Sequence, residues 1–239
     1  MCVNFTACSK DDGSDGAGGT NGGDYTNEKK LTKIVSETWT EKFSYDNQGR
    51  LIEVEEILID GTSKYTYIWG DDAVVVNKNS ETELFDTTTN YTYSINNGMV
   101  QSVDKGENPT TYHYNSSNRL SRIVSQWYTE EYVWNGDKLM TIEEGAIKFT
   151  YKECCTKGYS PLLVEWVEVE PLFIAHPEAI GSRTKQLPAT VTESWNDGPG
   201  YGEQTEVISY SYKFDNEGYI SQIDMAQYGE KITFTLTWE

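Results

Sequence analysis

The sequence contains little basic charge. Lys and Arg number 19 against 38 Asp and Glu in 239 residues, so the formal net charge is −19. That excess repels a phosphate backbone and an anionic membrane surface, so binding to nucleic acid or to acidic lipids is disfavoured. We interpret the charge as keeping a sheet-forming, aromatic-rich surface in solution.

Long apolar runs and recognisable catalytic motifs are also absent. No stretch approaches the roughly 20 apolar residues of a transmembrane helix, and there is no phosphate-binding glycine loop or nucleophile elbow. His113 and His176 stand alone, so we predict surface or edge positions and no zinc site. Adjacent carboxylates such as Glu55 and Glu56 point to opposite faces of a strand, unlike an acid/base pair. The sequence therefore predicts no enzyme, metal or cofactor.

Cysteine is scarce, with residues only at positions 2, 8, 154 and 155. Cys154 and Cys155 are adjacent and could bridge each other only in a strained ring. On a strand they would point to opposite faces. We therefore expect no long-range disulfide framework.

The N-terminus carries the signs of an export signal. Phe5 to Cys8 resembles the end of a bacterial lipoprotein signal, in which small residues precede a lipidated cysteine, here Cys8. Residues 9–24 contain six Gly and no large apolar side chain, which predicts a flexible tether with a reach on the order of 20 Å. Ser9 to Asp12 resembles the acidic stretch of surface lipoproteins. Seven residues are too few for a whole signal, so we expect 1–8 to be its remnant, with a disordered tail as the alternative.

The rest of the chain repeats an aromatic doublet with one residue between its rings. Such spacing places both rings on one face of a strand, and six of the seven intervening residues are polar, as a solvated opposite face requires. The doublets are Phe43/Tyr45, Tyr65/Tyr67, Tyr91/Tyr93, Tyr112/Tyr114, Tyr132/Trp134, Phe149/Tyr151 and Tyr210/Tyr212.

Turn residues and an apolar pair follow most doublets. Segments such as Asp46–Gly49 and Asn96–Gly98 offer the Asn, Asp and Gly that accept positive φ. The apolar pairs, such as Leu51/Val54, have a spacing of three, which predicts a β-bulge that brings both side chains to one face. Because Asn115–Asn118 lacks the turn glycine and the Phe149/Tyr151 repeat runs into Cys154, we expect these two repeats to be irregular.

Each unit is thus a β-hairpin of about 20 residues, and hairpins in series form an antiparallel meander. We predict one all-β domain over 25–239 with about 12–14 strands, in a strongly curved or barrel-like sheet. Residues 156–190 lack the doublet and hold a dense apolar stretch interrupted by Pro171. We interpret them as an irregular cap or plug, followed by a loop to the last hairpin.

Two resemblances fit this layout. Tyr45 to Leu51 is similar to the YD repeats of Rhs-type toxins and teneurins, which build curved β shells. The order of Cys8, tether, hairpins, Gly181, Leu187-Pro188 and a last Tyr-rich hairpin resembles a Bacteroidetes-type lipoprotein family of unknown function. That resemblance implies a porin-like β fold and no assigned activity.

The function that we predict is that of a non-enzymatic binding module for a glycan, peptide or protein. We expect a lipid-anchored protein at the outer membrane or cell surface, or alternatively in the periplasm. Trp69, Trp127 and Trp195 lie outside or beside the doublets and are the candidate ligand contacts. The alternatives are a structural envelope protein, a membrane-embedded barrel with its aromatic face toward lipid, and a glycan-active enzyme.

Overall fold

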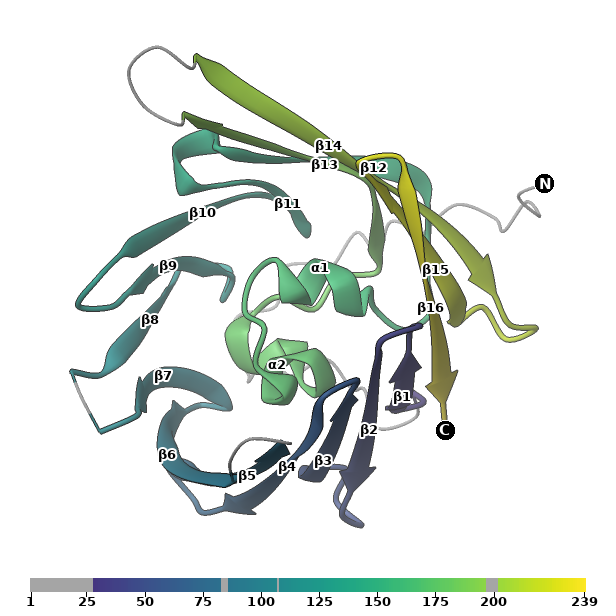
Figure 1. Cartoon of the computed structure of the whole chain (residues 1–239). Coiled ribbons are helices and arrows are strands. Elements are labelled where there is room, and N and C mark those ends of the chain that lie inside the picture. The colour runs from purple at the N-terminus through teal and green to yellow at the C-terminus, as the bar shows by residue number, and fades with distance from the viewer. Residues whose placement is uncertain (1–27, 83–85, 107, 197–201) are drawn as a thin grey trace, which may run out of the picture.

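The computed structural model describes residues 28–82, 86–106, 108–196 and 202–239, so Cys8 and the expected tether lie outside the described residues. Sixteen strands form one closed antiparallel barrel in which each strand pairs with its sequence neighbours (Figure 1). The strands are β1 Leu31–Val35, β2 Trp39–Tyr45, β3 Leu51–Leu58, β4 Gly61–Trp69, β5 Ala73–Thr82, β6 Asp86–Asn96, β7 Met99–Asp104, β8 Thr110–Tyr114, β9 Leu120–Val124, β10 Thr129–Asn135, β11 Lys138–Ile142, β12 Ile147–Cys155, β13 Gln186–Asn196, β14 Glu203–Phe214, β15 Ile220–Gln227 and β16 Glu230–Trp238.

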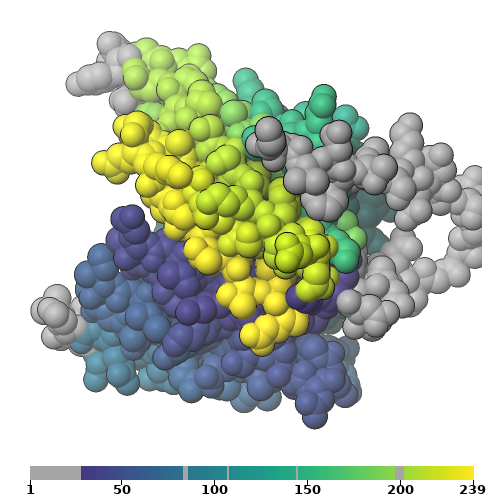
Figure 2. Space-filling model, turned by 90° about the vertical axis from the view of Figure 1, so that its right-hand side faces the viewer, coloured from purple at the N-terminus to yellow at the C-terminus, as the bar shows by residue number. Residues whose placement is uncertain are grey.

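The barrel closes where the first strand meets the last. Ile34 of β1 lies opposite Leu236 of β16 in an antiparallel ladder, and Lys30 and Glu239 exchange two backbone hydrogen bonds of 2.6 and 2.9 Å. Figure 2 shows this seam, with the yellow C-terminal strands packed beside the purple N-terminal ones.

The predicted all-β antiparallel meander is confirmed, and the barrel contains sixteen strands rather than the predicted 12–14. Nine strands carry no aromatic doublet, and three of these, β1, β5 and β13, lie outside both the repeated unit of doublet, turn and apolar pair and the C-terminal strand. Each of the three pairs with a strand that carries a doublet. A strand count derived from the repeat alone is therefore too low.

The aromatic doublets face the interior, as predicted. The first ring of each doublet is buried, at most 6% exposed, and the second ring is buried or half-buried. Ser44, His113 and Val133, which lie between rings, are exposed on the outer face. The aromatic face is thus turned to the interior, so the expectation that it would face lipid in a membrane-embedded barrel is wrong.

Each apolar pair contains the predicted bulge. In the hairpin of β2 and β3, Ser44 lies opposite Glu53 but Tyr45 lies opposite Leu51, which leaves Ile52 unmatched. The same shift occurs in the β6–β7, β8–β9, β10–β11 and β14–β15 ladders. Leu51 and Val54 are consequently both fully buried, because the extra residue brings them to one face.

The repeat without a turn glycine is regular, contrary to our expectation. Asn118 adopts φ 56°, and its N–H donates to the Asn115 carbonyl at 3.0 Å, as Gly49 donates to Asp46 at 2.9 Å. Asn tolerates this left-handed conformation better than most residues. The Phe149/Tyr151 repeat is irregular as predicted, since the β12–β13 register shifts on both sides of Tyr151.

Seven Tyr or Trp side chains complete the hydrogen bonding at one end of the barrel. At this end seven ladders stop early, those of β1–β2, β3–β4, β7–β8, β9–β10, β11–β12, β13–β14 and β15–β16. That of β9 and β10, for example, ends at Glu131 opposite Arg122. The carbonyl beyond it, on Leu120, accepts from Trp134 Nε1 at 2.6 Å. The equivalent donor–carbonyl pairs, at 2.5–2.9 Å, are Tyr45–Leu31, Trp69–Leu51, Tyr114–Val100, Tyr151–Leu139, Tyr212–Pro188 and Trp238–Ile220.

Short helices fill the interior of the barrel (Figure 1): α1 Pro161–Glu165, α2 Pro171–Ala175 and the 3-10 helix η2 Pro177–Ile180. Both α-helices begin with proline, whose missing N–H is harmless at the first helical position. A sixteen-stranded barrel is too wide for its wall side chains to fill, so the apolar helices complete the core. The prediction of a plug is confirmed, although strand β13 already begins at Gln186 within the predicted segment 156–190.

His176 lies in this plug and is buried, so the predicted surface or edge position is wrong for it. Its Nε2 accepts from the Leu51 N–H at 3.0 Å, and the rings of Tyr45 and Trp69 pack edge-on against its imidazole, with centroids 5.9 and 5.8 Å away. The side chain therefore joins the plug to the wall. His113 is exposed, as predicted.

We predict that Tyr151→Phe lowers the free energy of unfolding by about 1–2 kcal/mol, because it leaves the Leu139 carbonyl without its donor. The control is Tyr67→Phe. The Tyr67 hydroxyl is buried and has no hydrogen-bond partner among the described residues, so its removal should be neutral or stabilising. Thermal and urea unfolding measure both changes, and equal effects would contradict the assigned role of the Tyr151 hydroxyl.

We also predict that Gly181→Ala destabilises the protein by at least about 1 kcal/mol. Gly181 ends η2 with φ 63°, and a Cβ there would lie 2.1 Å from the Asn118 carbonyl oxygen. Gly218→Ala is the matched control, because its φ is also positive but a Cβ would meet only Lys157 side-chain atoms at 3.9 Å or more. If both variants unfold at the same urea concentration, the contact of the added Cβ with the Asn118 carbonyl does not cause the loss of stability.

Candidate functional site

One mouth of the barrel is partly covered by the segment between α1 and α2, Trp166–Glu170, whose side chains reach the wall. Tyr112 donates to Glu168 at 3.0 Å and Tyr91 donates to Glu170 at 2.9 Å. Lys105, just after β7, lies 2.5 Å from the Glu170 carboxylate. These contacts fix the segment beside the turns that follow β7 and β9.

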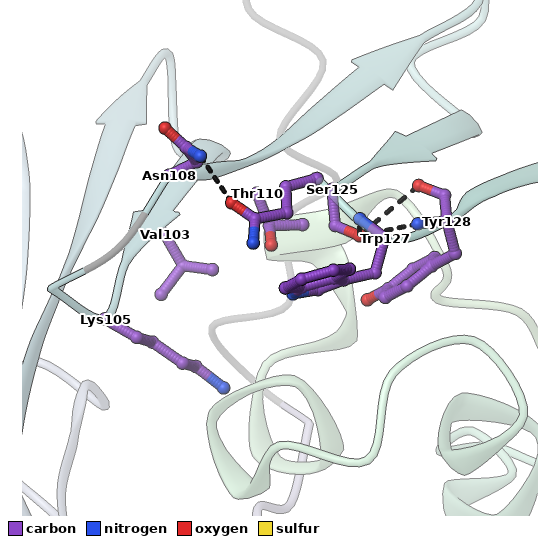
Figure 3. A pocket seen from close by; sticks show the side chains of 8 residues that line it. Val103, Lys105, Asn108, Thr110, Ser125, Trp127 and Tyr128 are labelled. Atoms are coloured by element: carbon purple, nitrogen blue, oxygen red, sulfur yellow. Dashed lines mark hydrogen bonds between the residues drawn. The ribbon is translucent and has the colours of Figure 1, made fainter.

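A cavity of about 310 Å³ lies between those two turns. Val103, Lys105, Asn108 and Thr110 line it from β7 and β8, and residues 125–128 line it from the β9–β10 turn. Figure 3 shows the rings of Trp127 and Tyr128 side by side, with the Lys105 side chain below and to the left of them in this view.

Ser125 fixes the backbone of the β9–β10 turn that carries the two rings. The Ser125 hydroxyl accepts from the N–H groups of Trp127 and Tyr128 at 3.1 and 3.0 Å, and the Ser125 N–H donates to the Tyr128 carbonyl at 2.9 Å. The Trp127 side chain is nevertheless 80% exposed and that of Tyr128 47% exposed. The turn is thus held by its backbone while its rings face water.

Amide and hydroxyl groups surround the rings. Asn108 Nδ2 donates to Gln126 Oε1, which joins the two turns across the cavity (Figure 3). Burial and the nearby charges of Glu168 and Glu130 raise the pKa of the Tyr128 hydroxyl, so it stays protonated and can donate. A fixed aromatic surface beside amide and hydroxyl groups is suited to a ligand with both apolar and polar faces.

The three tryptophans predicted as contacts lie in different places. Trp127 lines the cavity, whereas Trp195 lies on β13 and is 40% exposed. Trp69 does not have the exposed position that we expected, because its indole packs on the core and donates to Leu51. Sequence reasoning missed Asn108, Gln126 and Tyr128, since only the folded turns bring them together.

The described residues contain no group of three or more His, Cys, Asp or Glu side chains that could hold a metal ion. Among the same residues, no helix is both long and apolar enough to cross a membrane.

Comparison with solved structures agrees with the fold. A porin-like protein from Bacteroides uniformis superposes with a TM-score of 0.61 at 15% identity, over 89% of this chain and 97% of that one. A porin-like protein from Bacteroides vulgatus aligns over 87% and 98% at 11% identity, with a TM-score of 0.38. No protein-family model and no curated protein matches the chain. The predicted likeness to a porin-like β fold is confirmed, and at these identities it shows the fold alone.

Acid should stabilise the fold through the plug carboxyls. Burial raises the pKa of Glu165 to about 7, and burial with the charge of Glu170 raises that of Glu168 to about 7. In the unfolded chain the pKa of each carboxyl is near 4.5, so folding takes up protons between about pH 5 and 7. The free energy of unfolding therefore falls as the pH rises through this range. Each unit of pKa shift contributes about 1.4 kcal/mol.

Urea unfolding across this pH range measures the effect. We expect Glu165→Gln and Glu168→Gln each to reduce the decline, whereas Glu131→Gln, an exposed carboxyl on the outer face, should leave it unchanged. The carboxyls of Glu178 and Asp224, whose pKa values are lowered to about 2, titrate below this window. A flat profile for the unmodified chain would contradict the prediction.

Proposed function

We propose that this chain is a non-enzymatic binding protein of the bacterial cell envelope and that the cavity beside Trp127 holds a neutral glycan. The observation that carries the proposal is the pair of exposed rings, Trp127 and Tyr128, fixed next to the side-chain amides of Asn108 and Gln126 (Figure 3). A sugar ring presents an apolar C–H face to an aromatic ring and hydroxyl groups to amides, so the cavity offers complementary groups for both.

The charge of the protein favours a neutral ligand over an acidic one. The formal net charge is −19, and Lys105 at the cavity already pairs with Glu170. Long-range repulsion therefore disfavours phosphorylated or strongly acidic polymers, including nucleic acid.

A binding role is favoured over catalysis by the residues of the cavity. Its described lining contains no carboxylate, whereas glycoside hydrolysis usually employs two carboxylates that flank the bond to be cleaved. A filled interior likewise favours a binding surface over a channel, because α1 and α2 occupy the centre of the barrel (Figure 1).

Attachment to the envelope belongs to the same proposal. We place the lipid on Cys8, with residues 9–24 as the tether, and the barrel at the outer membrane or cell surface. The fold shared with a porin-like protein from Bacteroides supports this location. Metabolic labelling with a clickable fatty acid tests it, since Cys8→Ser should abolish labelling of the protein expressed with a complete signal peptide, whereas Cys154→Ser should not.

Glycan binding is tested first on an array of neutral oligosaccharides and then by calorimetry with the best of them. Trp127→Ala should weaken binding at least about tenfold, because it removes the central stacking surface. Trp195→Ala is the matched control, a partly exposed tryptophan away from this cavity, and should bind as the unmodified chain does. An array without any bound glycan, or equal affinities for the two variants, would favour a structural envelope protein instead.

A further inference from the structure

A second cavity opens at the same mouth, against a different part of the wall. It has a volume of about 400 Å³ and lies between the end of α1 and strands β13–β15. Trp166 and Tyr210 line it with their rings, and Leu162, Ile208 and Met225 add apolar surface. Trp166 Nε1 donates to the Tyr210 hydroxyl at 2.9 Å, so the two rings form a fixed wall.

The charged groups of this cavity are carboxylates. Glu165 and Glu193 line it, and its described lining contains no Lys, Arg or His. Glu206 lies directly opposite Glu193 in the β13–β14 ladder and two residues before Ile208 on the same strand face. The wall therefore presents adjacent acidic side chains to an apolar space.

Glu206 and one further carboxylate, Glu41, are deeply buried and incompletely paired. Glu206 is 7% exposed and its Oε1 has no hydrogen-bond partner among the described residues. Glu41 is 2% exposed, its Oε2 also lacks such a partner, and its charge interacts with that of Glu165. Buried carboxylate oxygens of this kind are unfavourable unless a donor or a positive charge approaches them.

The remaining choice is between a metal ion and an organic cation. The described residues provide no cluster of three ligands for a metal ion, whereas aromatic rings and apolar side chains next to carboxylates are the surroundings that an organic ammonium group prefers. Trp195 lies two residues beyond Glu193 on the same face of β13, where its indole extends the aromatic surface.

We propose that this second cavity binds an organic ammonium compound, with the charged nitrogen at Glu165 and Glu193 and an apolar body against Trp166 and Tyr210. The site is distinct from the proposed glycan cavity, since the two share none of their lining residues.

The test uses 2-phenylethylamine as the probe and 2-phenylethanol as its neutral counterpart. Calorimetry with the full chain at about pH 8, where the amine is charged, should show the amine binding at least about tenfold more tightly than the alcohol. Equal affinities would indicate an apolar crevice and overturn the proposal, as would an absence of binding. Displacement of the amine by calcium chloride, but not by sodium chloride of equal ionic strength, would identify a metal site and also overturn it.

Matched glutamate variants locate the site. Glu165→Gln and Glu193→Gln should each weaken amine binding at least about tenfold, while Glu131→Gln on the outer face should not. Removing a carboxylate charge from this interior should not impair folding, which thermal unfolding verifies. Trp127→Ala should leave amine binding unchanged, so this proposal can fail or succeed independently of the glycan proposal. Unchanged amine affinity in both glutamate variants would place the amine elsewhere and overturn the assignment.

Discussion

At the end of the barrel where the chain leaves β12 and returns in β13, seven backbone ladders stop short. Seven Tyr or Trp side chains replace the missing backbone donors there. Each donates to a carbonyl that the neighbouring strand no longer reaches. Buried backbone carbonyls need a partner, so this substitution allows neighbouring strands to separate while their backbone stays satisfied. In five of the seven doublets the second ring is one of these donors, which explains why Tyr or Trp stands there rather than Phe; the hydroxyls of Tyr67 and Tyr93 are the exceptions.

The width of the barrel explains the plug. Inward-facing side chains on sixteen strands surround a space that they cannot fill alone, and an apolar segment has to enter it. Polar groups fasten that segment at both ends: Arg119 donates to the carbonyls of Gly181 and Arg183 at 3.1 and 2.6 Å, and Tyr112 donates to Glu168 at the opposite mouth. The segment from 166 to 170 then separates a neutral aromatic cavity from an acidic one.

Much of this architecture can be read from short-range patterns. The doublets, the bulge at Leu51/Val54 and the turn at Asp46–Gly49 depend on neighbours within a few residues. Trp69 shows where such reasoning stops, because spacing alone assigns Tyr67 to the donor role and only the ladder geometry gives that role to Trp69. The cavities are harder still to predict, since Asn108 and Gln126 come from separate turns and Glu165 of the plug meets Glu193 of the wall only in the folded barrel.

Closure through β1 and β16 determines the order in which the barrel can be completed. The outer edge of β1 stays unpaired until β16 has been synthesised, about 200 residues later, so the barrel closes only after all sixteen strands are available. An exposed strand edge is a template for unwanted pairing, and this edge stays open while the rest of the sheet forms. Because Lys30 and Glu239 are hydrogen-bonded neighbours, joining them and cutting elsewhere would yield a circular permutant with the same sheet and a different order of strand emergence.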